Sequence, residues 1–195
     1  MSAIAPFRTS ICGIEELADH CEVGVTHVLS ILDPEWPVPE VFGAYGEHAR
    51  LELRFHDIIE NDIPDRLPPT PAHVTQLLAF GHELLEETGA GETHLLVHCH
   101  GGVSRSTASI ALIMAQAMPD VSAERILAHI LQIRPQAWPN LRILEIGDTV
   151  LNRRGSLIAA AAGLYREQLA RRPGLADAMR AGGRQREVEA GLNST

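Results

Sequence analysis

The most constraining feature of the sequence is a cysteine that lies between a strand-like run and a helix-like run. Residues 95–97 are Leu-Leu-Val, Cys99 follows, and Arg105 comes six positions later. Residues 106–118 are then mostly apolar or small, and Pro119 ends them. Short apolar runs favour buried strands, and longer ones favour helices. Because strand, loop and helix in this order build sheets covered by helices, the sequence predicts an α/β fold.

The loop between Cys99 and Arg105 has the composition of an anion-binding site. Its glycines can take positive φ and let backbone N–H groups approach an anion. The positive end of the following helix dipole would point into the loop. This field and Arg105 both favour a thiolate at Cys99, and the planar guanidinium can bind two phosphoryl oxygens. The predicted phosphate-binding residues are His100, Gly101, Gly102, Val103, Ser104 and Arg105.

Residues 98–106, HCHGGVSRS, resemble the H-C-x5-R-[S/T] motif of the cysteine-dependent protein tyrosine phosphatases, and most of all their small dual-specificity branch. Residues 24–31 are similar to an early core strand of that branch, and residues 134–140 to the segment before its last core helix. The resemblance covers most of residues 8–150. It implies one domain with a mainly parallel sheet of four to five strands flanked by helices.

The resemblance also implies roles for the residues of the motif. Cys99 would be the nucleophile and carry a phosphocysteine intermediate. Ser106 would hydrogen-bond the cysteine sulfur and ease its departure. His98 would help to orient the loop and tune the thiolate, although a histidine at a strand end often only satisfies a neighbouring backbone group. No metal or cofactor is needed for this chemistry.

A phosphatase of this kind also needs an acid that protonates the leaving oxygen. Asp57 is the candidate, because it directly follows the strand-like residues 51–55, where the family usually carries its acid. The spacing of 42 positions from Asp57 to Cys99 is longer than is usual in the small branch, which implies an insertion. Asp62 and Asp65, farther along a proline-rich loop, therefore remain alternatives.

The predicted activity is hydrolysis of phosphate monoesters in proteins or small molecules. Phosphotyrosine is the favoured substrate, and phosphoserine and phosphothreonine stay open because the sequence does not show the pocket depth. An alternative is a catalytically inactive phosphate-binding module, which the intact Cys99, Arg105 and Ser106 disfavour. Arsenate reductases use a similar loop, but they usually carry it near the N-terminus, whereas here it lies in mid-chain.

Several other functions are disfavoured. His94, His98, His100 and Cys99 could ligate a metal, but neighbouring strand residues point to opposite faces and no C-x2-C or H-E-x2-H spacing occurs. All 16 basic residues are arginine, so the loop has no lysine of the kind common in lipid-phosphate enzymes. Residues 1–150 hold eight arginines against 21 acidic residues, a net charge of −13, which disfavours nucleic acid.

Composition sets the remaining expectations. With 195 residues and 45% hydrophobic content the chain can bury one sizeable core. It lacks a membrane-length apolar run and a secretory leader, so we expect a cytoplasmic monomer with no membrane partner. The exclusive use of arginine suggests a bacterial coding sequence. Cys12 and Cys21 are expected to be buried, and whether either one pairs with Cys99 on oxidation stays open.

The chain divides into a predicted phosphatase domain, residues 1–153, and a basic C-terminal helical extension, residues 154–195, with an irregular end from residue 191. We expect the extension to present a solvated surface, with a docking role as the alternative. Residues 33–48 are expected to form a loop that covers a core edge, with one wall of the active-site cleft as the alternative. The strands are expected at residues 8–12, 26–32, 50–55 and 94–98, and the helices at 71–89, 106–118, 122–134 and 140–153, with two more in the extension.

Overall fold

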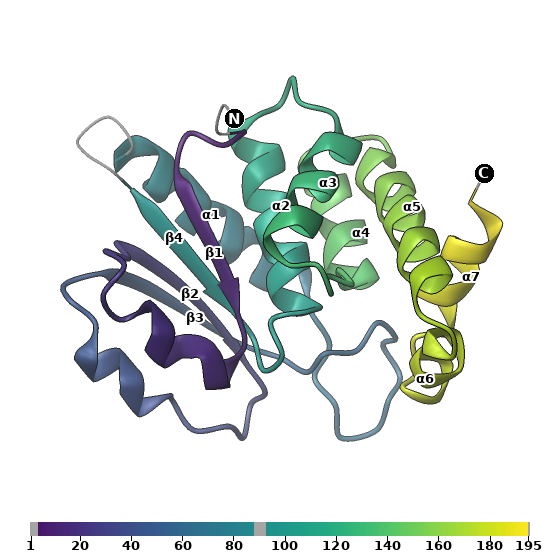
Figure 1. Ribbon diagram of the computed structural model, residues 1–195, viewed down its shortest axis with the longest axis horizontal. Coiled ribbons are helices and arrows are strands. Elements are labelled where there is room, and N and C mark those ends of the chain that lie inside the picture. The colour runs from purple at the N-terminus through teal and green to yellow at the C-terminus, as the bar shows by residue number, and fades with distance from the viewer. Residues whose placement is uncertain (1–3, 88–92, 195) are drawn as a thin grey trace.

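The computed structural model describes residues 4–87 and 93–194, with a four-stranded parallel sheet at its centre (Figure 1). The strand order is β1-β4-β2-β3, and each neighbouring pair is parallel. All residues of β2 and β4 are buried, as expected for the central strands of a parallel sheet. The predicted α/β fold is confirmed. The strands are β1 (Arg8–Cys12), β2 (His27–Leu32), β3 (Ala49–Arg54) and β4 (His94–His98).

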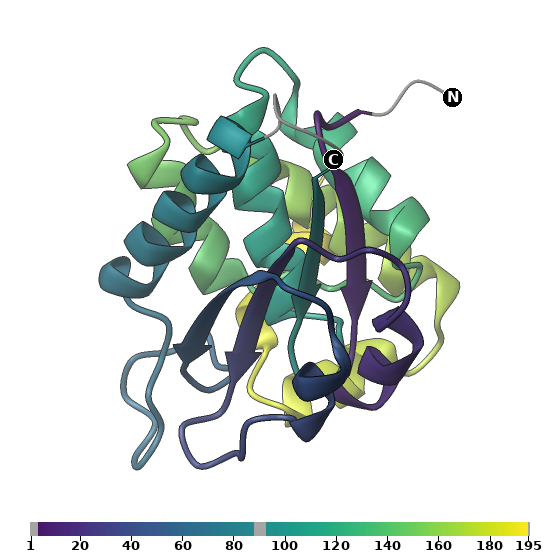
Figure 2. The ribbon, with the colours of Figure 1, turned by 90° about the vertical axis from the view of Figure 1, so that its left-hand side faces the viewer.

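The two faces of the sheet are covered differently (Figure 2). The larger core lies between one face and a layer of α-helices. On the other face, Leu17 and Phe42 from two 3-10 helices, and Tyr45 directly after the second, cover a smaller core. The 3-10 helices are η1 (Ile14–His20) and η2 (Glu40–Ala44), and the α-helices are α1 (Pro71–Glu87), α2 (Arg105–Ala117), α3 (Ala123–Ile133) and α4 (Leu141–Val150).

Side chains in the sequence set where these helices begin and end. Ser122 Oγ accepts a hydrogen bond from the Arg125 amide, and Asn140 Oδ1 accepts one from the Ile143 amide, so each residue is the N-cap of the helix that follows it. The fourth α-helix ends at Val150 rather than at residue 153, because Asn152 takes a positive φ of 52°. The predicted end of α1 near residue 89 falls outside the described residues.

The C-terminal extension consists of α5 (Ser156–Arg171), α6 (Leu175–Ala181) and α7 (Gln185–Asn193). It packs against α3 and α4 and shares the larger core. Tyr165 of α5 is fully buried, and its ring stacks on Trp138 at a centroid distance of 4.5 Å. The expectation of a merely solvated surface is therefore wrong. The expected irregular end is also wrong for residues 191–193, which belong to α7.

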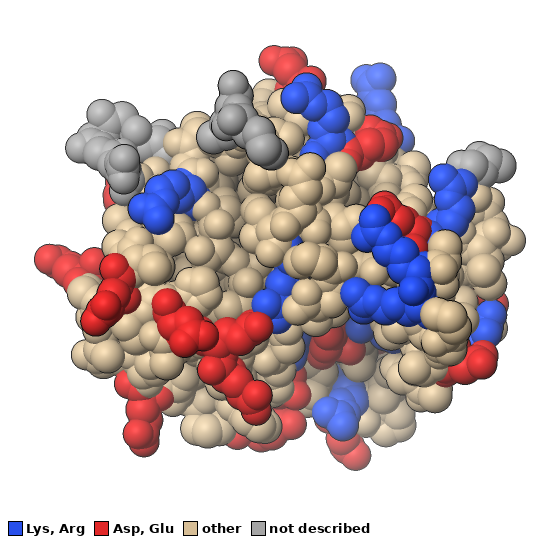
Figure 3. All heavy atoms as spheres, viewed as in Figure 1, with Lys and Arg blue, Asp and Glu red and all other residues tan. Residues whose placement is uncertain are grey.

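Charge is distributed as unevenly on the surface as along the sequence. Figure 3 shows acidic side chains gathered over η1 on one side of the molecule and arginines over α5 to α7 on the other. None of the helices in residues 4–87 and 93–194 has the length and apolar character of a membrane span.

Candidate active site

The loop from Cys99 to Arg105 follows the carboxyl end of β4 and leads into α2. The Cys99 side chain is buried, and its sulfur lies 3.3 Å from Ser106 Oγ in the first turn of that helix. Gly102 has a φ of +64°, and a Cβ there would come within 2.4 Å of the Cys12 carbonyl carbon. Glycine is therefore favoured at this position for two reasons: the backbone is left-handed, and a side chain would not fit. Gly101 does not have a positive φ.

The guanidinium of Arg105 is buried and held at one nitrogen. Nη1 donates to Asp33 Oδ1 and to the Phe55 carbonyl oxygen, each at 2.6 Å. The whole residue is only 3% exposed, and its buried Nε has no hydrogen-bond partner among the described residues. A buried donor without a partner costs free energy, about 1–3 kcal/mol, unless a ligand satisfies it. Arg105 thus offers a fixed donor for an anion at the loop.

Asp57 lies beside the same loop. Its Oδ1 accepts hydrogen bonds from Ser104 Oγ at 2.7 Å, Asn140 Nδ2 at 2.8 Å and Arg184 Nη1 at 3.2 Å. Burial raises the pKa of Asp57, but the charges of Arg184 and Arg105 and the hydrogen bonds outweigh it. The pKa of the carboxyl therefore lies below its ordinary value.

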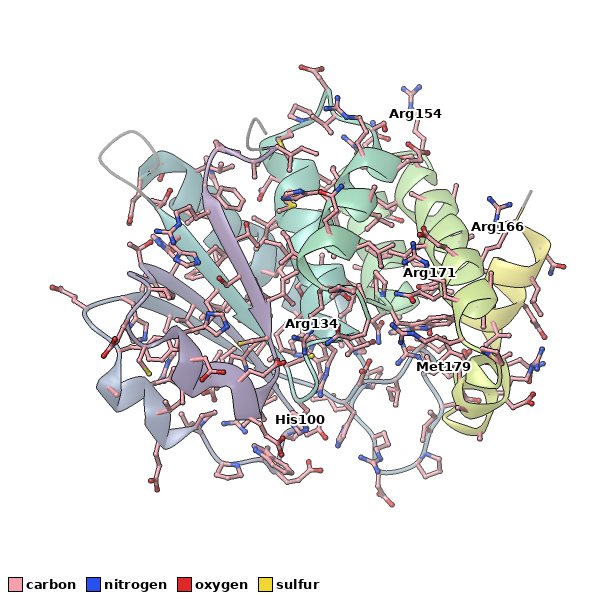
Figure 4. All side chains as sticks on the ribbon, in the orientation of Figure 1. His100, Arg134, Arg154, Arg166, Arg171 and Met179 are labelled. Atoms are coloured by element: carbon pink, nitrogen blue, oxygen red, sulfur yellow. The ribbon has the colours of Figure 1, made fainter. Side chains whose placement is uncertain are left out.

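One cavity of about 270 Å³ joins these groups. Met179 of α6 lines it from the C-terminal extension, and His100 lines it from the loop between Cys99 and Arg105; both are labelled in Figure 4. Asp62 and Asp65 are exposed and do not line it. The cavity therefore brings together Asp57 and the loop, with the other two aspartates outside. Its lining residues are Asp57, Cys99, His100, Gly101, Val103, Ser104, Arg105, Gln136, Trp138, Arg172, Leu175, Met179 and Arg184.

Known phosphatases are similar to this chain in sequence or in fold. No model of a known protein family matches the chain. The human protein phosphatase Slingshot homolog 3 is 42% identical over 73 residues, which is 36% of this chain and 11% of that protein, so the chain spans about a tenth of that relative. The crystal structure of human DUSP28 superposes with a TM-score of 0.55, at 19% identity over 78% of this chain and 93% of that chain. The Yvh1 phosphatase domain from Chaetomium thermophilum gives a TM-score of 0.52, at 21% identity over 78% of this chain and 94% of that chain.

The fold is that of a dual-specificity phosphatase. Within this phosphatase fold, the loop from Cys99 to Arg105 takes the place expected of it, between a central strand and a helix.

The two histidines of the loop region lie in different surroundings. His98 is buried, and its Nε2 lies 2.8 Å from Ser30 Oγ on the neighbouring strand. Burial lowers the pKa of His98 to about 4, so this residue is neutral at pH 7 and carries no positive charge that could tune the thiolate. The ring of Trp36, which is 45% exposed, lies 4.6 Å from the ring of His100. Residues 33–48 therefore cover the smaller core through η2 and also contact the phosphatase loop through Trp36.

The candidate metal ligands His94, His98, His100 and Cys99 do not bring their ligand atoms close enough together to share an ion. In the described part of the chain, the histidine, cysteine and acidic side chains that come close enough to share an ion are instead Asp33, Glu35 and His56. His56 Nδ1 accepts a hydrogen bond from the Leu67 amide, so a neutral His56 carries its proton on Nε2, which lies 3.3 Å from Glu35. This arrangement satisfies the histidine by hydrogen bonds and leaves it no lone pair for a metal.

Two residues of the site were missed by sequence reasoning. Asp33, which holds Arg105, directly follows β2, and polar residues at the carboxyl ends of central parallel strands often line a site. The position of Asp33 directly after a central strand is a sequence signal that could have identified it. Arg184 lies 127 positions from Asp57, and no local pattern in the sequence marks it.

Proposed function

We propose that the protein is a cysteine-dependent phosphatase that hydrolyses phosphate monoesters through a phosphocysteine intermediate. The observation that carries this proposal is that Cys99 and the buried, unpartnered Nε of Arg105 belong to one loop, which lines the cavity that also holds Asp57. The intact nucleophile and arginine favour catalysis over an inactive phosphate-binding module. The assignment to a bacterial branch of these enzymes and the monomeric state are part of the same proposal.

The chemistry follows from the positions of these groups. The Cys99 sulfur attacks phosphorus while the loop amides and Arg105 hold the nonbridging oxygens, and Asp57 gives its proton to the departing oxygen. Water then attacks the phosphocysteine and transfers a proton to the Asp57 carboxylate, which releases inorganic phosphate and the Cys99 thiolate. Ser106 Oγ, at 3.3 Å from the sulfur, can donate a hydrogen bond to that thiolate.

The cavity walls favour an aromatic phosphate. Trp138 and Val103 from the phosphatase domain and Leu175 and Met179 from α6 supply apolar surface next to the phosphate loop. An aryl ring can bury against these side chains, whereas the short side chain of phosphoserine leaves most of them uncovered. We therefore propose phosphotyrosine as the preferred substrate, with the C-terminal extension forming one wall of its site.

The test is hydrolysis of one peptide prepared with phosphotyrosine and again with phosphoserine. We expect kcat/KM to be at least about tenfold higher for the phosphotyrosine form, because it alone fills the apolar walls. An acid-quenched single turnover should also yield a covalent phosphoprotein. Phosphate release from neither peptide would contradict the proposed activity. A preference for phosphoserine would contradict only the substrate class.

Replacing Asp57 with asparagine tests the acid. The amide keeps an oxygen for Ser104 and Asn140 but has no proton to give, so we expect kcat for a phosphotyrosine peptide to fall by roughly 10²-fold or more with little change in KM. Steady-state kinetics at the acidic end of the pH profile, where the wild-type Asp57 carries its proton most often, measures this loss. Asp62→Asn is the matched control and should keep the wild-type rate. A loss of kcat in Asp62→Asn or Asp65→Asn, with Asp57→Asn still active, would assign the role of general acid to that other aspartate.

A further inference from the structure

Arg184, in the turn between α6 and α7, reaches the centre of the proposed active site. Its side chain is only 8% exposed. Nη1 lies 3.2 Å from Asp57 Oδ1, and Nη2 donates to Ser104 Oγ at 2.9 Å. The C-terminal extension therefore binds the candidate acid and a residue of the phosphate loop with a single guanidinium.

Glu187 keeps this guanidinium in place. It is fully buried, and its Oε1 accepts a hydrogen bond from Arg184 Nη2 at 2.6 Å and another from the Leu141 amide at 2.9 Å. Its Oε2 accepts one from Trp138 Nε1 at 2.5 Å. A buried charge pair persists only when further hydrogen bonds satisfy it, as they do here. Arg184 is thus fixed between Glu187 on one side and Asp57 on the other.

The hydrogen bonds to Asp57 have a direction that matters for an acid. The donors from Ser104, Asn140 and Arg184 all reach Oδ1. A proton carried by this carboxyl group is therefore favoured on Oδ2, because a proton on Oδ1 would meet three donors. The contacts fix the plane of the carboxyl group and distinguish its two oxygens.

Around Asp57 the fixed charges are positive. Arg184 comes from the extension and Arg105 from α2. The other charged or titratable groups that line the same cavity are Arg172, which directly follows α5, and His100 and Cys99 of the loop. Tyr165 of α5 also interacts electrostatically with Asp57. The negative charge of Glu187 is compensated by its ion pair with Arg184.

We propose that Arg184 is a positioning residue, which holds Oδ1 of Asp57 so that the proton on Oδ2 is available to the leaving oxygen and which sets the pH range of that step. The C-terminal extension is then part of the catalytic apparatus as well as a wall of the substrate site. This inference rests on the proposed phosphatase activity and on Asp57 as its acid.

The test compares Arg184→Gln with two aryl phosphates that differ in their need for an acid. Phenyl phosphate has a poor leaving group, and we expect its kcat/KM, which reports the step that needs the acid, to fall at least about tenfold. The leaving group of 2,4-dinitrophenyl phosphate departs as an anion, so its kcat/KM should change less than about twofold. Because the lost positive charge favoured the carboxylate, the alkaline limb of kcat/KM should move to higher pH. Arg180→Gln, on an exposed ion pair of α6 with Asp177, is the matched control and should match the wild type.

A second comparison separates a positioning role from a structural one. If Arg184 acts through Asp57, the double variant Asp57→Asn, Arg184→Gln should be no slower than Asp57→Asn alone. Arg184→Lys keeps the charge but loses the planar fork, so its alkaline limb should stay in place while kcat/KM for phenyl phosphate falls. If Arg184→Gln does not fold, Arg184→Lys tests the positioning role in its place.

Equal losses on both substrates, or an undiminished effect of Arg184→Gln in the Asp57→Asn background, would overturn the positioning role. An unmoved alkaline limb in Arg184→Gln would overturn the claim about pH. Failure of the proposed function would look different, since the wild type would then hydrolyse neither substrate or Asp57→Asn would keep the full rate.

Discussion

Replacement of Cys99 with serine is expected to reduce turnover of aryl phosphates by at least about 10³-fold, the largest effect of any single change in this protein. A hydroxyl at this position is a far weaker nucleophile than a thiolate, and the phosphoenzyme would have no thiolate leaving group in the second step. The loop amides and Arg105 remain, so the variant should still bind a phosphotyrosine peptide. Initial-rate kinetics and isothermal titration calorimetry measure the two expectations separately.

The other cysteines provide the control for this experiment. Burial raises the pKa of Cys12 to about 12, so Cys12 stays a thiol at neutral pH and cannot replace the nucleophile. Cys21 is partly exposed, contrary to the sequence expectation of a buried residue, and lies outside the cavity. Cys21→Ser should therefore keep the wild-type rate. Full turnover by Cys99→Ser would rule out the phosphocysteine mechanism.

The second large effect is expected for Arg105→Lys, with a loss in kcat/KM of about 10²- to 10³-fold. Lysine keeps the positive charge, so the loss reports geometry rather than charge. The three donors of an ammonium group share one nitrogen. A lysine that donates to Asp33 and the Phe55 carbonyl oxygen therefore has no second nitrogen, such as Nε of Arg105, to hold against a phosphoryl oxygen. Steady-state kinetics with a phosphotyrosine peptide measures the loss.

Arg125→Lys, on the exposed side of α3, is the matched control for the same substitution away from the cavity. It should keep the wild-type kcat/KM. If Arg105→Lys kept more than half of the wild-type value, the fork of Arg105 could not be the group that holds the phosphoryl oxygens.

The parts of the site that sequence reasoning predicted are those that lie close together in the chain. Cys99, Arg105 and Ser106 fall within eight residues, and the strand before them and the helix after them are set by local apolar patterns. The observed bounds of β4 and α2 agree with these patterns to within one residue. Asp57 was found because it follows a strand, and the cavity places it beside the loop.

The basic, alanine-rich composition of the extension predicts a position on the solvent side. That composition gives no sign that Tyr165 stacks on Trp138 or that Glu187 is buried beneath Arg184. Burial of a charged residue is favourable only when a partner of opposite charge arrives from elsewhere in the fold. Such a partner leaves no periodic or local signal in the chain.

The sequence by itself determined the α/β fold and the strand, loop and helix that carry Cys99 and Arg105, because backbone propensity and apolar periodicity act over a few residues. The tertiary structure alone decided which groups surround that loop. It brought Asp33 to Arg105 across 72 positions and Arg184 to Asp57 across 127. Packing of the C-terminal helices on the common core makes these long-range contacts, and so it is packing that closes the cavity and sets the charges around its acid.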